Sequence, residues 1–240
     1  SLSLNENAIL STANIYLTSG NIYIADTAKL IFTANMLLTS GNFAMSGNSE
    51  INAGSNLIIA GANLFASGNS TLKVTSGNLF LNISGNRFVN GVVSSANSIS
   101  LLSNAAFTGN LDIQSNGNIS LNTFDLSVGD YLNLTSSSNF TYLSGANLII
   151  DGNTIVNDRH TIPYSLGSTK IVSMGCLMYA SNLQYTDLNI LGGLEDRGFD
   201  TYVAGNLWIN NSSNTLLLTG SVNLQGQGNA VLLTELSETF

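Results

Sequence analysis

The chain of 240 residues is short of charge, and it has one cysteine, one histidine and one proline. Only 8% of its residues are charged, whereas a typical globular domain has roughly 25%. Asn, Ser, Thr and Gly must therefore supply most of the polar surface. A single cysteine excludes an internal disulfide and a cysteine-rich zinc site. The sequence also has no run of 18 or more apolar residues, the length that a transmembrane helix requires.

Basic side chains are especially few. The chain has six Lys and Arg residues and fourteen Asp and Glu residues, and its formal net charge is −8. So few cations cannot neutralise a run of phosphates, which argues against nucleic-acid partners. An acidic membrane surface is equally unattractive to this chain. Disorder is not expected either, because 44% of the residues are hydrophobic and disordered segments lack such residues.

An internal repeat fills the first third of the sequence. Short units of the form polar-apolar-x-apolar follow one another in steps of 7, 8 and 6 residues, a cycle of 21. The joins also recur: the Thr-Ser-Gly before Asn21 returns before Asn42. The units start at Asn14, Asn21, Lys29, Asn35, Asn42, Glu50, Asn56, Asn63 and Thr71.

The form of the units predicts the fold. Each unit is too short for a helix and alternates with a period of two, so it is a strand of about four residues. Small and polar residues at the joins permit sharp corners. Three corners in 21 residues predict an all-β, three-sided parallel β-helix, or β-solenoid, whose coils stack about 4.8 Å apart. Equivalent columns, such as Ile15, Met36 and Leu57, should point inward, and equivalent Asn side chains should form ladders.

The repeat has a break. It weakens after Asn78, resumes at Asn110, and is absent from about Asp158 to Asp200, before units such as NLWI at Asn206. Solenoids place insertions on one face and also need covered ends. We therefore expect solenoid coils over 1–157, a non-repeat insertion or cap over 158–205, and further solenoid-like strands over 206–240.

The 158–208 region holds the candidate ligand-binding residues: Asp187, Glu195, Asp196, Asp200 and Trp208. Three carboxylates within six residues could bind Ca²⁺, but their spacing does not match an EF-hand. A glycoside hydrolase needs two carboxyls flanking a sugar bond, and a solvated turn is the plainer interpretation. No nucleophile elbow or phosphate-binding loop occurs. We predict no catalytic residues, no metal and no cofactor.

The outward positions of the first coils are unusually apolar. Tyr16, Leu37 and Ile58 occupy the outward position of one side, and Tyr23 and Phe65 that of a second side. Monomeric proteins rarely expose large contiguous apolar patches. These five residues are therefore predicted to form an interface with another copy or with a neighbouring structural subunit.

The repeat resembles two groups of proteins in segments such as AFTGNLDI at 106–113 and VAGNLWI at 203–209. One group is the repeat region of filamentous-haemagglutinin-like secreted adhesins. The other is the β-rich shaft of phage tail fibres and tailspikes. The first resemblance implies a right-handed β-helix and adhesion, and the second implies a homotrimer and host contact.

Two functional hypotheses follow. The first is a non-catalytic, possibly adhesive structural protomer of an external fibre, appendage, or virion- or cell-surface assembly. The alternative is a carbohydrate-binding or carbohydrate-cleaving spike that uses the 158–208 region to meet a host glycan. Both hypotheses place the protein outside the cell or on the surface of a cell or virion.

The charge balance gives a first testable prediction. Purified protein should bind neither duplex DNA nor Zn²⁺, because cations and metal-binding side chains are too few. Fluorescence anisotropy of a labelled duplex and a zinc titration measure this. Salt-sensitive DNA binding at micromolar concentration would show that the interpretation of the acidic surface is wrong.

Overall fold

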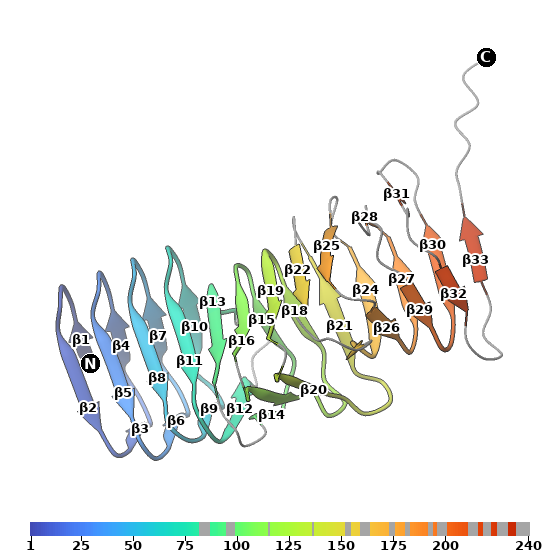
Figure 1. The fold of residues 1–240 in the computed structure, drawn as a ribbon. Coiled ribbons are helices and arrows are strands. Elements are labelled where there is room, and N and C mark those ends of the chain that lie inside the picture. The colour runs from blue at the N-terminus through green and yellow to red at the C-terminus, as the bar shows by residue number, and fades with distance from the viewer. Residues whose placement is uncertain are drawn as a thin grey trace.

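The structure, a computed structural model, is an all-β parallel solenoid in which successive coils follow one another along one axis (Figure 1). Every regular element within the described residues is a strand, so no helix there could cross a membrane. The structure describes residues 1–81, 87–94, 99–114, 116–135, 137–151, 155–158, 164–172, 176–180, 183–191, 194–195, 201–210, 216–217, 222–224 and 230–233.

The longest sheet, sheet II, takes one strand from each successive coil and has eleven strands. In spatial order they are β2 (Ile9–Thr12), β5 (Lys29–Phe32), β8 (Glu50–Ala53), β11 (Thr71–Val74), β13 (Asn90–Val93), β16 (Leu111–Ile113), β19 (Tyr131–Leu134), β22 (Ile155–Asp158), β25 (Cys176–Ala180), β28 (Leu194–Glu195) and β31 (Leu216–Leu217).

Two sheets flank sheet II in the N-terminal coils. Sheet I has four strands: β1 (Leu2–Leu4), β4 (Asn21–Ile24), β7 (Asn42–Met45) and β10 (Asn63–Ala66). Sheet III has seven: β3 (Ile15–Leu17), β6 (Met36–Leu38), β9 (Leu57–Ile59), β12 (Asn78–Leu81), β14 (Ile99–Leu101), β17 (Asn118–Ser120) and β20 (Asn139–Thr141).

Two further sheets take over these positions towards the C-terminus. Sheet IV has seven strands: β15 (Ala105–Phe107), β18 (Leu126–Val128), β21 (Asn147–Ile150), β24 (Ser168–Ile171), β27 (Leu188–Ile190), β30 (Leu207–Asn210) and β33 (Ala230–Leu233). Sheet V has four: β23 (Tyr164–Ser165), β26 (Leu183–Tyr185), β29 (Thr201–Val203) and β32 (Val222–Leu224).

The chain enters the sheets in a constant three-part order. It passes through sheets I, II and III up to β12, through II, III and IV from β13 to β21, and through II, V and IV from β22 onward. Sheet IV thus replaces sheet I, and sheet V replaces sheet III. All paired strands are parallel. This order is consistent with a three-sided coil.

The pairing register confirms the 21-residue coil of the N-terminal part. Ile15 pairs with Met36, and Met36 with Leu57, each 21 residues further on. Met36 and Leu57 are buried, and Ile15 in the first coil is partly buried against the same core. A second inward column, predicted by the same equivalence, contains Ile22, Phe43 and Leu64, and all three are buried.

Asparagine ladders fix the corners between the sides. At the corner before sheet III, Asn56 Nδ2 donates to Asn35 Oδ1 at 2.8 Å. Asn56 Oδ1 in turn accepts from the backbone N–H of Asn78 at 2.9 Å and from its Nδ2 at 3.0 Å. The Asn56 oxygen therefore satisfies a backbone donor at the corner as well as the amide of the next ladder residue. The same arrangement joins Asn21, Asn42 and Asn63.

The corner between sheets I and II requires a left-handed backbone. Four residues at equivalent positions of successive coils have φ between 55° and 68°: Glu6, Asp26, Gly47 and Gly68. A Cβ on Gly47 would lie 2.9 Å from the carbonyl oxygen of Asp26 in the coil below. Glycine removes this conflict, because it reaches positive φ at little cost and has no side chain.

Between residues 158 and 205 the described strands take part in the sheets of the solenoid. Strands β24 and β27 continue sheet IV, β25 and β28 continue sheet II, and β26 and β29 lie in sheet V. The coil is shorter here: Thr169 pairs with Leu188, and Leu188 with Leu207, at steps of 19 residues. A search for a 21-residue cycle therefore loses the register.

The inward columns predict the effect of a buried charge. Leu57→Asp should lower the free energy of unfolding by more than about 4 kcal/mol, because an unpaired carboxylate would replace a buried apolar side chain. Urea unfolding followed by circular dichroism measures this. Leu57→Met is the matched control, because Met36 already occupies the same column, and it should cost less than about 1.5 kcal/mol. Similar losses for both variants would contradict the register.

The two ladders predict a larger loss for a residue within a ladder than for one at its end. Asn56→Ala should cost about 1–3 kcal/mol, because it leaves the Asn78 backbone N–H without its side-chain acceptor. Asn63→Ala removes an exposed ladder residue of the second ladder whose side chain donates one bond to Asn42, at 3.2 Å, so it should cost less. Equal losses of unfolding free energy for the two variants would count against a stabilising role of the ladder oxygen.

Candidate functional site

A continuous apolar stripe covers the outside of sheet III in the N-terminal coils. Tyr16 pairs with Leu37, Leu37 with Ile58, and Ile58 with Phe80 in successive strands. Tyr16 is 64% exposed, and the other three are partly exposed. Outward side chains in a ladder repeat about every 4.8 Å, so the four form one row along the solenoid axis. Phe80 is an addition to the predicted interface, and its unit NLFL already indicated an outward aromatic side chain.

A second, shorter stripe lies on sheet I. Tyr23 pairs with Ala44, and Ala44 with Phe65. Tyr23 is 42% exposed and Phe65 57% exposed. A short corner connects a strand of sheet III with the following strand of sheet I. In the first coil this corner consists of the residues between Leu17 and Asn21. The predicted interface residues therefore occupy two neighbouring sides of the same coils.

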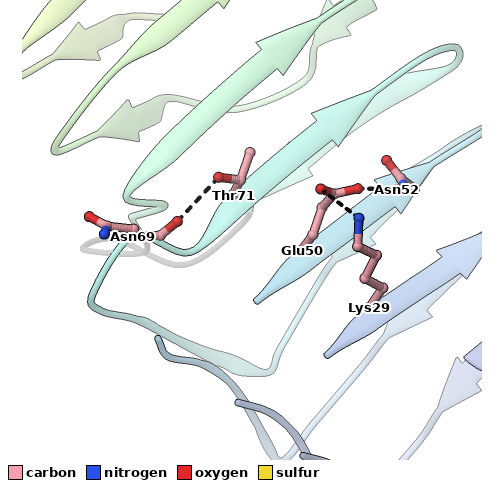
Figure 2. A network of polar contacts seen from close by, with 5 residues as sticks. All are labelled: Lys29, Glu50, Asn52, Asn69 and Thr71. Atoms are coloured by element: carbon pink, nitrogen blue, oxygen red, sulfur yellow. Dashed lines mark hydrogen bonds and ion pairs between the residues drawn. The ribbon is translucent and has the colours of Figure 1, made fainter. Parts of the chain in front are cut away.

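The third side of these coils carries polar and charged groups. Lys29 Nζ lies 3.4 Å from Glu50 Oε2, and Asn52 Nδ2 donates to Glu50 Oε1 at 2.7 Å, as Figure 2 shows. Nearby, the Thr71 hydroxyl donates to the Asn69 carbonyl at 3.3 Å. Such partly exposed pairs contribute little to stability. On this side Ile9 is 65% exposed, but it pairs with Lys29, so the apolar side chains of sheet II form no continuous row.

Later coils carry polar side chains at several outward positions. In sheet III Asn78 is followed in register by Ser100, Ser120 and Thr141, whereas Leu102, one residue beyond the pair of Leu79 and Leu101, is 41% exposed. In sheet II the polar outward side chains include Asp112 and Asn133, which are joined by a 2.7 Å hydrogen bond. The paired row of four large apolar side chains therefore belongs to the N-terminal coils, although single apolar side chains such as Tyr131 and Trp208 are exposed in later ones.

Asp187, a candidate ligand-binding residue, lies at the corner before β27 and belongs to a ladder. Its Oδ1 accepts from Asn206 N at 2.7 Å and from Asn206 Nδ2 at 3.1 Å. Its Oδ2 accepts from the Ser168 hydroxyl at 3.3 Å. Asp125 has the same role three steps earlier, since its Oδ1 accepts from the backbone and side chain of Asn147. The carboxylate of Asp187 therefore has a structural role in the corner.

Trp208 occupies an outward position of sheet IV. It pairs with Asn189 of the preceding coil, which pairs with Lys170 of the coil before. The indole is 37% exposed, and the side-chain oxygen of Asn189 is buried without a hydrogen-bond partner. Asp187 lies two residues before Asn189, and Asn189 pairs with Trp208 of the next coil. Asp187 and Trp208 therefore lie on the same side of the solenoid, in adjacent coils.

The remaining candidate carboxylates do not join this pair. Glu195 lies on β28 of sheet II, a different side of the coil from β27 and β30. Asp196 and Asp200 lie outside the described residues. Among the described residues, no three His, Cys, Asp or Glu side chains are placed to hold a metal ion. The described geometry thus provides no pair of carboxylates in one cleft.

Comparisons of the chain with protein-family models, with curated proteins and with solved structures find no match. The fold and its surfaces are therefore the basis for the functional conclusion.

Proposed function

We propose that the chain is a non-catalytic structural protomer of an external fibre, appendage, or cell- or virion-surface assembly. The observation that carries this proposal is the pair of apolar stripes on sheets I and III. The stripes bind a second copy of the chain or an adjoining subunit. The resemblance of the repeat to secreted adhesins and to phage fibre shafts supports an external location.

The energetics of the stripes support association. Full burial of one large apolar side chain contributes about 1.5–3 kcal/mol, and monomers rarely expose contiguous apolar surface. The alternation that directs Leu57 and Ile59 into the core directs Ile58 outward, so no rearrangement within the coil can cover the stripe. A row repeating every coil suits a symmetric copy, because identical rows can pack against each other.

The stripes predict a specific loss of assembly. Leu37→Ser, Ile58→Ser and Phe65→Ser combined should convert an associated wild-type chain into a monomer without unfolding it, because all three side chains point outward. Sedimentation velocity at micromolar concentration measures the mass, and circular dichroism measures the fold.

A matched control removes three apolar side chains from sheet IV and the corners beside it. Ile149 points outward from β21, and Val172 and Leu191 are each 42% exposed. Their combined replacement by Ser should leave the sedimentation coefficient unchanged. A wild-type chain that sediments as a stable monomer, or equal effects of the two triple variants, would overturn the proposed interface.

A further inference from the structure

A cavity lies where one ladder of the solenoid is interrupted. Sheet III ends at β20 and sheet V begins at β23, and the segment from Tyr142 to Ala146 connects β20 with β21. The cavity has a volume of about 550 Å³, and this segment lines it together with residues of the next two corners of sheet IV. Its size falls within the usual range for small-molecule sites, about 300–1,000 Å³.

The ring of Tyr142 is held in one position beside this cavity. Gly167 has φ of 72°, and a Cβ on it would lie 2.8 Å from the ring carbons Cδ1 and Cε1. The ring therefore packs directly on the glycine backbone, where no other residue leaves room. The Tyr142 hydroxyl lies 3.4 Å from Thr186 Oγ1. The aromatic ring and a hydroxyl two coils further on thus line the same cavity.

Asp187 supplies a fixed carboxylate to the opposite wall. Asn206 holds its Oδ1 by two hydrogen bonds, and the Ser168 hydroxyl holds its Oδ2 by one. A Cβ on Gly205 would lie 2.5 Å from Oδ1, so this glycine too permits the close approach. Because each carboxylate oxygen has two lone pairs, Oδ2 retains the capacity to accept a bond from a ligand.

The connecting segment that lines the cavity is exposed from Leu143 to Gly145. Leu143 is 58% exposed. Gly145 has φ of 96°, and a Cβ on it would meet nothing within 4 Å. This part of the lining is therefore in contact with solvent.

The groups that line the cavity fit a sugar ring. An aromatic ring offers an apolar surface to the C–H groups of a pyranose. A carboxylate accepts short, charge-assisted bonds from hydroxyls, and Ser168 and Thr186 both donate and accept. The described lining contains one carboxylate and no Lys or Arg, which disfavours anionic sugars.

We propose that this cavity binds a neutral pyranose unit of a glycan, with Tyr142 against the ring and Asp187, Ser168 and Thr186 bound to its hydroxyls. This activity is separate from assembly, because the cavity lies among coils that carry neither apolar stripe. The structural role proposed above does not depend on it.

Saturation-transfer NMR of the full chain with glucose, galactose, mannose and N-acetylglucosamine tests the site. The wild-type chain should transfer saturation to at least one of the four sugars. Asp187→Asn should weaken binding of that sugar at least tenfold by removing the charge. Asn occupies the equivalent corner in Asn147 and Asn206, so the ladder and the fold should be preserved in this variant.

Asp125→Asn is the matched control, because Asp125 has the same ladder role and does not line the cavity. It should leave sugar binding unchanged. Tyr142→Leu keeps an apolar side chain over Gly167 but removes the ring, and it should also weaken binding at least tenfold.

Three outcomes overturn the proposal: no transfer from the wild-type chain to any of the four sugars, undiminished binding by Asp187→Asn, or equal losses in Asp187→Asn and Asp125→Asn. Sedimentation of the same samples reports assembly independently. A failure of the sugar site is therefore distinguishable from a failure of the structural role.

Discussion

The solenoid depends on one constraint: each coil must close on itself at a length that places its strands in register with those of both neighbours. A slip of one residue would direct a whole inward column to the outside, because side chains alternate with a period of two. The ladder residues oppose such a slip at the corners. Asn56 is an example, since its oxygen accepts the backbone N–H of the next coil's Asn78 and its amide donates to Asn35. Core packing and corner chemistry therefore specify the same register.

This constraint explains how far the sequence predicts the structure. Where coils have a constant length, as from Asn14 to Thr71, the spacing of units predicts the strands, the inward columns and the ladders. Where coils shorten, as between Thr169 and Leu207, the same chemistry continues at a 19-residue step. Ser168 and Asp187 replace asparagine there, because any short acceptor side chain can fill the ladder position. In the sequence Asp187 is therefore an isolated carboxylate without a visible repeat partner. In the structure its hydrogen bonds are those of a corner residue.

The candidate sugar site shows what periodicity cannot predict. Tyr142 stands in the fourth, inward position of the unit NFTY, and its partners Thr186 and Asp187 lie more than forty residues further along the chain. They meet because sheet III stops at β20 and sheet V starts at β23. The described residues show a second interruption between β10 of sheet I and Phe88, which bridges to Phe107 of sheet IV, and a cavity of about 520 Å³ lies beside it. The repeat pattern predicts where a strand ladder continues. Both cavities lie beside places where one sheet ends, and the repeat pattern does not predict these places.

The outward positions carry functional information because the fold makes few demands on them. Inward residues must be apolar for every coil to stack, and corner residues must turn the chain and accept hydrogen bonds. An outward residue such as Ile58 or Ser120 meets only its neighbours in the same row and whatever lies outside. Sheet III tolerates both kinds, since one outward row contains Tyr16, Leu37 and Ile58, and the row in register with Asn78 contains Ser120 and Thr141. Stacking alone therefore cannot account for the apolar row. The proposed partner subunit accounts for the row, if its own surface repeats at the same coil spacing of about 4.8 Å.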